Sequence, residues 1–220
     1  MVGGGVPTGR IVERMTLSDI PITTIDGEQT SLAEFDNKVL MIVNVASRCG
    51  LAPQYEKLEA LQKTYGDRGF TFLGFPSNQF LQELGSEEKI KEYCSTTWGV
   101  TFPMFEKIRV NGKQQHPLYT ELVKTPDAKG HAGKVSWNFE KFVITPAGDV
   151  HRFRPTTEPD SEEIVDLIEA SLPVSDSTER TETTHSESES GDGTEHSETT
   201  HTETEHSETT TETHSEESRA

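Results

Sequence analysis

The chain has 220 residues, 31% of them hydrophobic, and a formal net charge of −18 at neutral pH. This acidic balance argues against binding to nucleic-acid phosphates, which needs clustered Lys and Arg. No apolar run approaches the roughly 20 residues of a membrane-spanning helix, so we expect no membrane span. Two cysteines, Cys49 and Cys94, are too few for a disulfide-stabilised secreted domain and are typical of a cytoplasmic protein.

Composition divides the chain into three parts. Residues 1–14 lack the hydrophobic region of a secretory signal, and we interpret them as a flexible extension or the product of an upstream start. Residues 174–220 hold 14 acidic and 2 basic residues, a net charge of −12, and almost no apolar side chain. Such a segment cannot offset its ordering entropy, so we predict a disordered acidic tail rich in Ser, Thr, Glu and His. Residues 15–173 remain as one folded domain.

The predicted elements begin with a hairpin over residues 17–32, whose turn is Asp26-Gly27. Residues 38–46 (KVLMIVNVA) and 70–76 (FTFLGFP) are continuous apolar runs, typical of strands covered on both faces. Helical spacing of apolar residues fills residues 53–66 between them. Further along, the patterns predict helices over 86–98, 115–124 and 160–172 and two strands within 138–155. This order predicts an α/β fold with a partly parallel, mixed central sheet and helices on both faces.

Cys49 follows the first buried strand and precedes a helix, at the sheet edge where α/β proteins place their chemistry. Unpaired backbone N–H groups and the helix dipole favour a thiolate there. The alternative is a small buried hydrophobic residue, as most free cysteines are. Ala52 stands where a dithiol reductase has its second cysteine, so a disulfide partner can only be Cys94. Cys94 follows Ile90 at helical spacing and also fits an inward-facing core position.

Seven motifs in order resemble the glutathione peroxidase family. They are NVASRCG, FPSNQF, QELGSEEKIKEYC, FPMFEKIRVNG, HPLY, WNFEKF and GDVHRFRP. The resemblance runs from about Ile20 to Leu172 and implies a thioredoxin-like fold. It also implies reduction of hydroperoxides by a thiol at Cys49, through a cysteine sulfenic acid, with no cofactor and no metal site.

The family surrounds its nucleophile with a Gln, a Trp and an Asn, and the resemblance assigns the last two to Trp137 and Asn138. The glutamine falls on Gln82, although the run NQFLQELG is one residue shorter than the family pattern; Gln79 is the alternative. Amide and indole N–H groups would stabilise a thiolate and orient a peroxide. Taken without the resemblance, Trp137 fits a core residue and Asn138 a turn residue. Asn78, in the same run, is a candidate support for the loop.

Many sulfur-type members of the family carry a resolving cysteine at the position of Cys94. The resemblance therefore implies a Cys49–Cys94 disulfide that thioredoxin reduces, and local unwinding of residues 88–99 to form it. Ser77 stands where some relatives have a third cysteine. The short connection before Trp137 implies a monomer, and the absence of a clear basic cluster makes glutathione a weaker candidate than thioredoxin as reductant.

Two other functions share these features. A peroxide sensor that passes its disulfide to a partner protein would use the same two thiols. A metal carrier is suggested by five tail histidines, His185, His196, His201, His206 and His214, but scattered His in a polar tract is more often a matter of composition.

Overall fold

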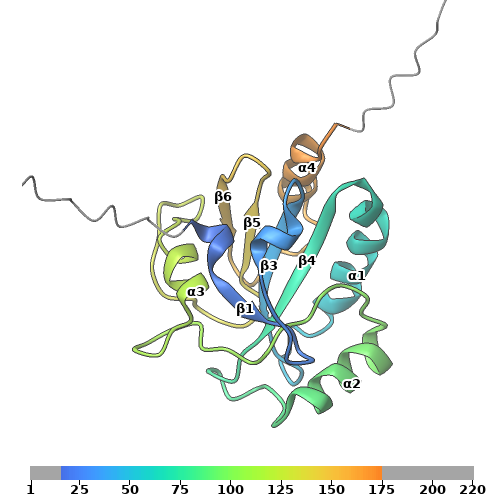
Figure 1. Cartoon of the computed structure of the whole chain (residues 1–220), viewed down its shortest axis with the longest axis vertical. Helices are drawn as coiled ribbons and strands as arrows, with labels where there is room; N and C mark the ends of the chain where they lie inside the picture. The colour runs from blue at the N-terminus through green and yellow to red at the C-terminus, as the bar shows by residue number, and fades with distance from the viewer. Residues whose placement is uncertain (1–15, 175–220) are drawn as a thin grey trace, which may run out of the picture. The chain divides into compact units, whose positions relative to one another are not determined.

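The computed structural model describes residues 16–174, so the predicted extension and the predicted tail beyond Val174 lie outside the described residues. Short 3₁₀ turns lie at Leu17–Asp19, Leu32–Phe35 and Gly66–Arg68. The strands are β1 (Pro21–Thr23), β2 (Gln29–Ser31), β3 (Val39–Val45), β4 (Phe70–Pro76), β5 (Lys141–Ile144) and β6 (Val150–Phe153). The helices are α1 (Gln54–Tyr65), α2 (Glu87–Trp98), α3 (Pro117–Leu122) and α4 (Glu162–Ser171) (Figure 1).

The central sheet has the order β4-β3-β5-β6. Strands β3 and β4 are parallel, because the α1 crossover returns the chain to the same end of the sheet, and the other two pairings are antiparallel. β1 and β2 form a separate antiparallel hairpin, with Gly27 in the left-handed region of its turn. This topology confirms the mixed α/β sheet of the thioredoxin-like fold.

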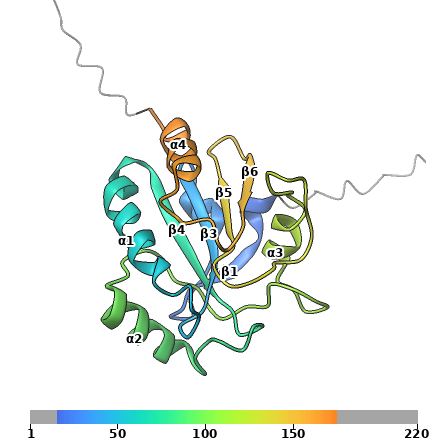
Figure 2. The same cartoon turned by 180° about the vertical axis from the view of Figure 1, so that it is seen from behind.

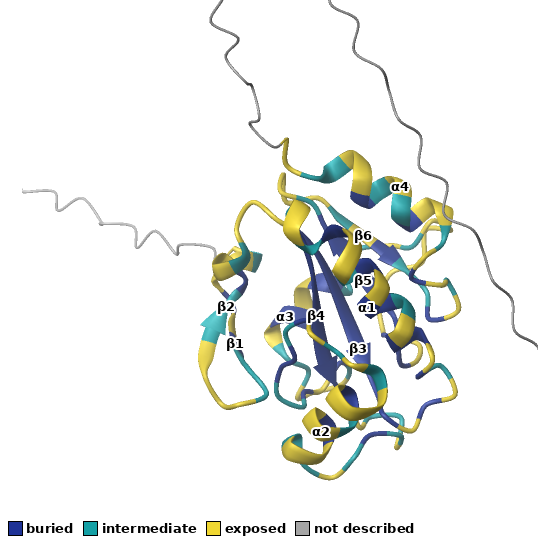
Figure 3. Ribbon diagram, turned by 90° about the vertical axis from the view of Figure 1, so that its right-hand side faces the viewer, coloured by how far each residue is buried: buried dark blue, intermediate teal, exposed yellow. Residues whose placement is uncertain are grey.

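The alternation of side chains along β3 creates two hydrophobic cores. Val39, Met41, Val43 and Val45 face the side covered by α1 and α4, whereas Leu40 and Ile42 face α3 and the hairpin. Figures 1 and 2 show these layers, and Figure 3 shows β3 and β4 buried between them. Burial on both faces explains why the β3 sequence is a continuous apolar run.

Helix α2 lies at the carboxyl ends of β3 and β4 and is mostly exposed (Figure 3). Ser86 precedes it, and two acidic residues occupy its first turn, as its sequence predicts. It ends at Gly99, which has a φ of 63°, and the Val100 N–H donates to the Cys94 carbonyl at 3.2 Å. Only Ile90 and Cys94 are buried along its length.

The predicted hairpin, strands and helices are all present, with ends displaced by a few residues. Helix α3 is shorter than its pattern indicates, because His116 caps it and Pro117 opens its first turn. In the described part of the chain, no helix combines the length and the apolar character needed to cross a membrane.

Candidate active site

Cys49 lies in a series of turns between the end of β3 and the start of α1. Its sulfur accepts a hydrogen bond from the Leu51 N–H at 3.4 Å, and its carbonyl accepts from the Ala52 N–H at 2.9 Å. Cys49 is 5% exposed, so little of its surface is accessible to solvent. Because α1 begins at Gln54, the amide that contacts the sulfur belongs to the turn and not to the helix.

Gln82 and Asn138 come together at this turn. The Asn138 Nδ2 donates to the Gln82 Oε1 at 2.9 Å, and the Gln82 carbonyl accepts from the Arg48 N–H at 2.8 Å. Asn138 is fully buried, and its own Oδ1 has no hydrogen-bond partner among the described residues. The two amides therefore bond to one another and not to the sulfur, while the backbone of Gln82 joins their loop directly to the residue before Cys49.

Gln79, the alternative for the glutamine position, has a different environment. Its Nε2 donates to the Asn111 carbonyl at 2.9 Å and its Oε1 accepts from the Asn111 N–H at 2.6 Å. Asn78, the predicted loop support, accepts from the Glu83 N–H through its Oδ1 at 3.1 Å. Gln79 is thus bonded to the Asn111 segment, whereas the backbone of Gln82 is bonded to the residue before Cys49.

The loop before Gln82 contains a residue in an unusual conformation. Leu81, directly before Gln82, has a φ of 59° and is 86% exposed. A branched residue in the left-handed region is strained relative to glycine. Neither its conformation nor its exposure follows from the sequence pattern.

Trp137 is 42% exposed and therefore is not the core residue that composition alone would suggest. Its indole packs against the Phe80 ring with a centroid distance of 4.9 Å. Its backbone is held by Asn44 of β3, whose Nδ2 donates to the Trp137 carbonyl at 3.0 Å. Trp137 and Gln82 thus lie on segments joined by the Asn138 amide and the Phe80 ring.

Asn44 is a positioning residue that the sequence interpretation missed. Besides Trp137, it binds the Glu140 N–H through its Oδ1 at 3.1 Å, and its carbonyl accepts from the Phe139 N–H at 2.6 Å. Phe139 needs this support because its φ is 64°. A single Asn within the apolar run KVLMIVNVA was the available signal, since a fully buried amide requires partners.

A buried ion network supports the same segment from behind. Glu140 accepts from the Ser136 N–H at 2.7 Å, from the Arg152 Nε at 2.6 Å and from the Arg154 Nη1 at 2.9 Å. The side chains of Glu140 and Arg152 are both fully buried. Arg152 also donates to the carbonyls of Gly133 and Lys134, so the chain leading to the tryptophan is fixed.

Glu83, directly after Gln82, is a second residue that was missed. It is 6% exposed, and its Oε1 accepts from the Ser47 N–H at 3.0 Å and from the Leu84 N–H at 2.7 Å. Burial raises the pKa of this carboxyl, while hydrogen bonds and the charge of Lys107 act in the opposite direction. Its Oε2 is buried without a hydrogen-bond partner among the described residues.

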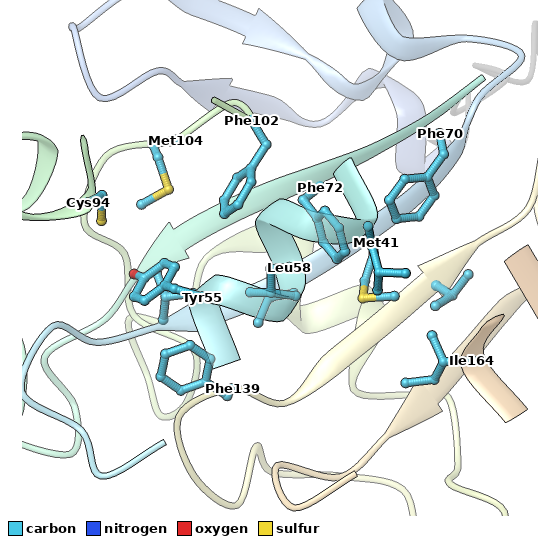
Figure 4. Packing of buried hydrophobic residues seen from close by; sticks show 14 of the residues in the cluster. Met41, Tyr55, Leu58, Phe70, Phe72, Cys94, Phe102, Met104, Phe139 and Ile164 are labelled. Atoms are coloured by element: carbon cyan, nitrogen blue, oxygen red, sulfur yellow. The ribbon is translucent and has the colours of Figure 1, made fainter. Parts of the chain in front are cut away.

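Cys94 faces inward from α2 beside Tyr55 of α1, and it is 2% exposed (Figure 4). Burial raises the pKa of its thiol to about 11, the Glu83 charge adds to this, and the Tyr55 hydroxyl opposes it. That hydroxyl faces Cys94 without satisfying hydrogen-bond geometry, and it has no other partner in residues 16–174. Trp98 stacks on the Tyr55 ring at 6.1 Å.

The two cysteines are both free, and they belong to one hydrophobic cluster. Ser77 is fully buried at the end of β4. No group of three or more His, Cys, Asp or Glu side chains suited to a metal ion occurs among residues 16–174. The five tail histidines considered for metal binding lie outside the described residues.

Comparison with known proteins identifies the family. The glutathione peroxidase family model matches residues 17–123. The thioredoxin/glutathione peroxidase BtuE of Escherichia coli is 50% identical over 172 residues, which cover 69% of this chain and 94% of the relative. The hydroperoxy fatty acid reductase gpx1 of Synechocystis is 45% identical over 152 residues, covering 66% of this chain and 90% of the relative.

A solved structure agrees with these sequence comparisons. The crystal structure of Trgpx in apo form aligns with a TM-score of 0.55 and 36% identity, covering 73% of this chain and all of that chain. The shared fold, the motif order and the identity to full-length relatives lead to one conclusion. The chain belongs to the glutathione peroxidase family.

Proposed function

We propose that this protein is a thiol peroxidase that reduces hydrogen peroxide and organic hydroperoxides at Cys49. The observation that carries the proposal is the joining of Gln82 and Asn138 to one another and, through the Gln82 carbonyl, to the residue before Cys49. Amides fixed beside a thiol suit the binding of a peroxide O–O group. The relatives named as a peroxidase and as a hydroperoxy fatty acid reductase support the reaction class.

In the proposed first step, the Cys49 thiolate attacks one peroxide oxygen. An S–O bond forms and the O–O bond breaks, so the sulfur is oxidised to sulfenic acid and the other oxygen leaves as water or an alcohol after taking a proton. The Leu51 N–H already donates to the sulfur and helps to hold it in place. Gln82, Asn138 and Trp137 position the peroxide, and Trp137 presents an exposed indole to it.

In the second step, Cys94 attacks the sulfenic sulfur and forms an intramolecular disulfide, which thioredoxin then reduces. The burial of Cys94 in the same cluster as Cys49 supports this pairing. Burial raises the pKa of the Cys94 thiol to about 11, which supports a resolving thiol that stays protonated in the reduced fold. We expect thioredoxin to be a better reductant than glutathione, and the name of the Escherichia coli relative includes both. We further propose that the protein acts as a cytoplasmic monomer.

Single-turnover oxidation of three proteins tests this function: wild type, Cys49→Ser and Cys94→Ser. Cys49→Ser should consume no peroxide above background. Cys94→Ser should consume one equivalent and stop as the sulfenic acid, which a dimedone adduct detects by mass spectrometry. The proposal fails if Cys49→Ser still consumes peroxide.

A peroxide sensor that passes its disulfide to a partner is the second candidate, because it would use the same two free, buried cysteines. Steady-state peroxide consumption with thioredoxin and its reductase separates the two functions. Sustained turnover supports the peroxidase. Formation of the disulfide without turnover supports the sensor.

A further inference from the structure

We propose that the Glu83 carboxylate accepts the proton of the Cys94 thiol during disulfide formation and delivers it to the departing hydroxyl of Cys49. This inference rests on the proposed peroxidase function and assigns a proton carrier to its second step.

The position of Glu83 is the first support. Its Oε1 bonds to the Ser47 N–H, two residues before Cys49, while the preceding Gln82 carbonyl bonds to the Arg48 N–H. The carboxyl therefore lies against the turn that carries the sulfenic acid. Cys94 must come to that same turn in order to form the disulfide.

The chemical state of Glu83 is the second support. Its other oxygen, Oε2, is buried without a hydrogen bond of good geometry in the described range, and no ion pair there involves this carboxylate. The Ser47 hydroxyl lies near the carboxyl and lowers its pKa, and this hydroxyl also lacks a hydrogen bond of good geometry. Both structural N–H bonds use Oε1. Oε2 can accordingly take up and release a proton without breaking the contacts that hold the turn.

Several groups tune this proton transfer. Lys107 binds the carbonyls of Leu84 and Gly85 and favours the ionised carboxylate. Tyr55 of α1 faces Cys94. Burial raises the pKa of the Tyr55 hydroxyl, and the charges of Glu83 and Tyr93 raise it further. A carboxyl whose pKa is raised by burial is a stronger base than an exposed one, which suits a thiol that is protonated near neutrality.

The step balances as follows. The Cys94 proton moves to the Glu83 Oε2, and the Cys94 sulfur attacks the Cys49 sulfur. The S–S bond forms as the S–O bond of the sulfenic acid breaks. The Cys94 sulfur is oxidised and the Cys49 sulfur is reduced. The leaving hydroxide takes the proton from Glu83 and departs as water, which returns the carboxylate to its starting state.

Stopped-flow fluorescence of the full chain resolves the two steps, because Trp137 lies at the site and Trp98 lies on the helix that must move. The first phase depends on peroxide concentration and the second does not. Glu83→Gln keeps an oxygen for the Ser47 and Leu84 N–H groups but removes the base. We expect its first phase to stay within about threefold of wild type and its second phase to slow by at least about tenfold near pH 7.

The pH profile separates proton transfer from a structural effect. The defect of Glu83→Gln should shrink as the pH approaches the Cys94 pKa of about 11, because the thiol then ionises unaided. Glu83→Asp should recover part of the rate at neutral pH. Glu59→Gln is a matched control: Glu59 is a buried carboxylate that accepts from the Thr101 N–H and hydroxyl, and its second phase should be unchanged.

Three results would overturn the inference. They are a wild-type second phase in Glu83→Gln at neutral pH, a defect that is as large at pH 10 as at pH 7, and an equal loss in both phases. A wild type that lacks the first phase would instead refute the proposed peroxidase function. If wild type and Glu83→Gln form the disulfide at the same rate, only the role of Glu83 is refuted.

Discussion

Cys49 and Cys94 are both buried, but their surroundings differ in kind. The turn of Cys49 is joined to other segments by hydrogen bonds over long sequence separations, from Arg48 to Gln82 and from Ser47 to Glu83. Helix α2, which carries Cys94, buries only Ile90 and that cysteine. Helix α1 has the same length of 12 residues but buries six of them. The proposed nucleophile thus lies in a turn that hydrogen bonds hold in place, and the proposed resolving thiol lies on a helix that we expect to detach at modest cost.

Hydrogen exchange gives the largest expected contrast between the two regions. The free energy of opening should be at least about 3 kcal/mol lower for the amides of α2 than for those of β3 and β4, which corresponds to more than about 100-fold faster exchange. The expected reason is the small buried area of α2. Exchange measured by mass spectrometry on reduced and peroxide-treated protein checks this. Protection of α2 equal to that of the strands in both states would contradict the comparison.

Asn44→Ala tests the rigid side of the comparison. Loss of the hydrogen bonds to Trp137 and Glu140 should lower the free energy of unfolding by about 2–3 kcal/mol, measured by urea denaturation, and should slow the first peroxide phase. Asn111→Ala is the control, since Asn111 makes a similar pair of bonds to Val135. Asn111→Ala should lower the free energy of unfolding but slow the first peroxide phase less than Asn44→Ala does. An equal loss of rate in both variants would remove the special role of Asn44.

The raised pKa of Cys94 predicts a pH dependence of stability. The folded thiol stays protonated up to about pH 11, whereas an unfolded thiol ionises near its usual pKa of about 8.5. The unfolded state therefore binds fewer protons between these values, and stability should fall as the pH rises through that range, by about 3 kcal/mol. Cys94→Ser should lose this part of the decline. Parallel stability curves for reduced wild type and variant would refute the assignment.

The smallest expected effect concerns the exposed contact between α2 and the hairpin. Lys91 pairs with Asp26 at 2.6 Å, and both side chains are more than half exposed. Lys91→Ala should cost less than about 1 kcal/mol and accelerate disulfide formation no more than a few-fold. Lys63→Ala, on α1, is a control that should leave this rate unchanged. A large acceleration would mean that the ion pair, and not the packing of Ile90 and Cys94, retains the helix.

Much of this architecture was predictable because it depends on local patterns. The apolar runs at 38–46 and 70–76, the Asp26-Gly27 turn and the inward position of Cys94 all follow from periodicity. The choice between Gln82 and Gln79 did not, because it depends on the path of a loop that is shorter than the family pattern. Glu83 gave no signal at all, since a carboxylate is normally exposed and its burial depends on backbone N–H groups distant in sequence.

The Val100 N–H, which closes the end of α2, donates to the carbonyl of Cys94. The proposed resolving residue is therefore also an anchor of the helix terminus. Displacing it frees the amides of Gly99 and Val100 together, so the last turn should melt in a single event while Ile90 keeps the first turns docked. Oxidation would then shorten the helix from its carboxyl end. The first turns would stay helical and packed through Ile90, and the last turn could re-form once the disulfide is reduced.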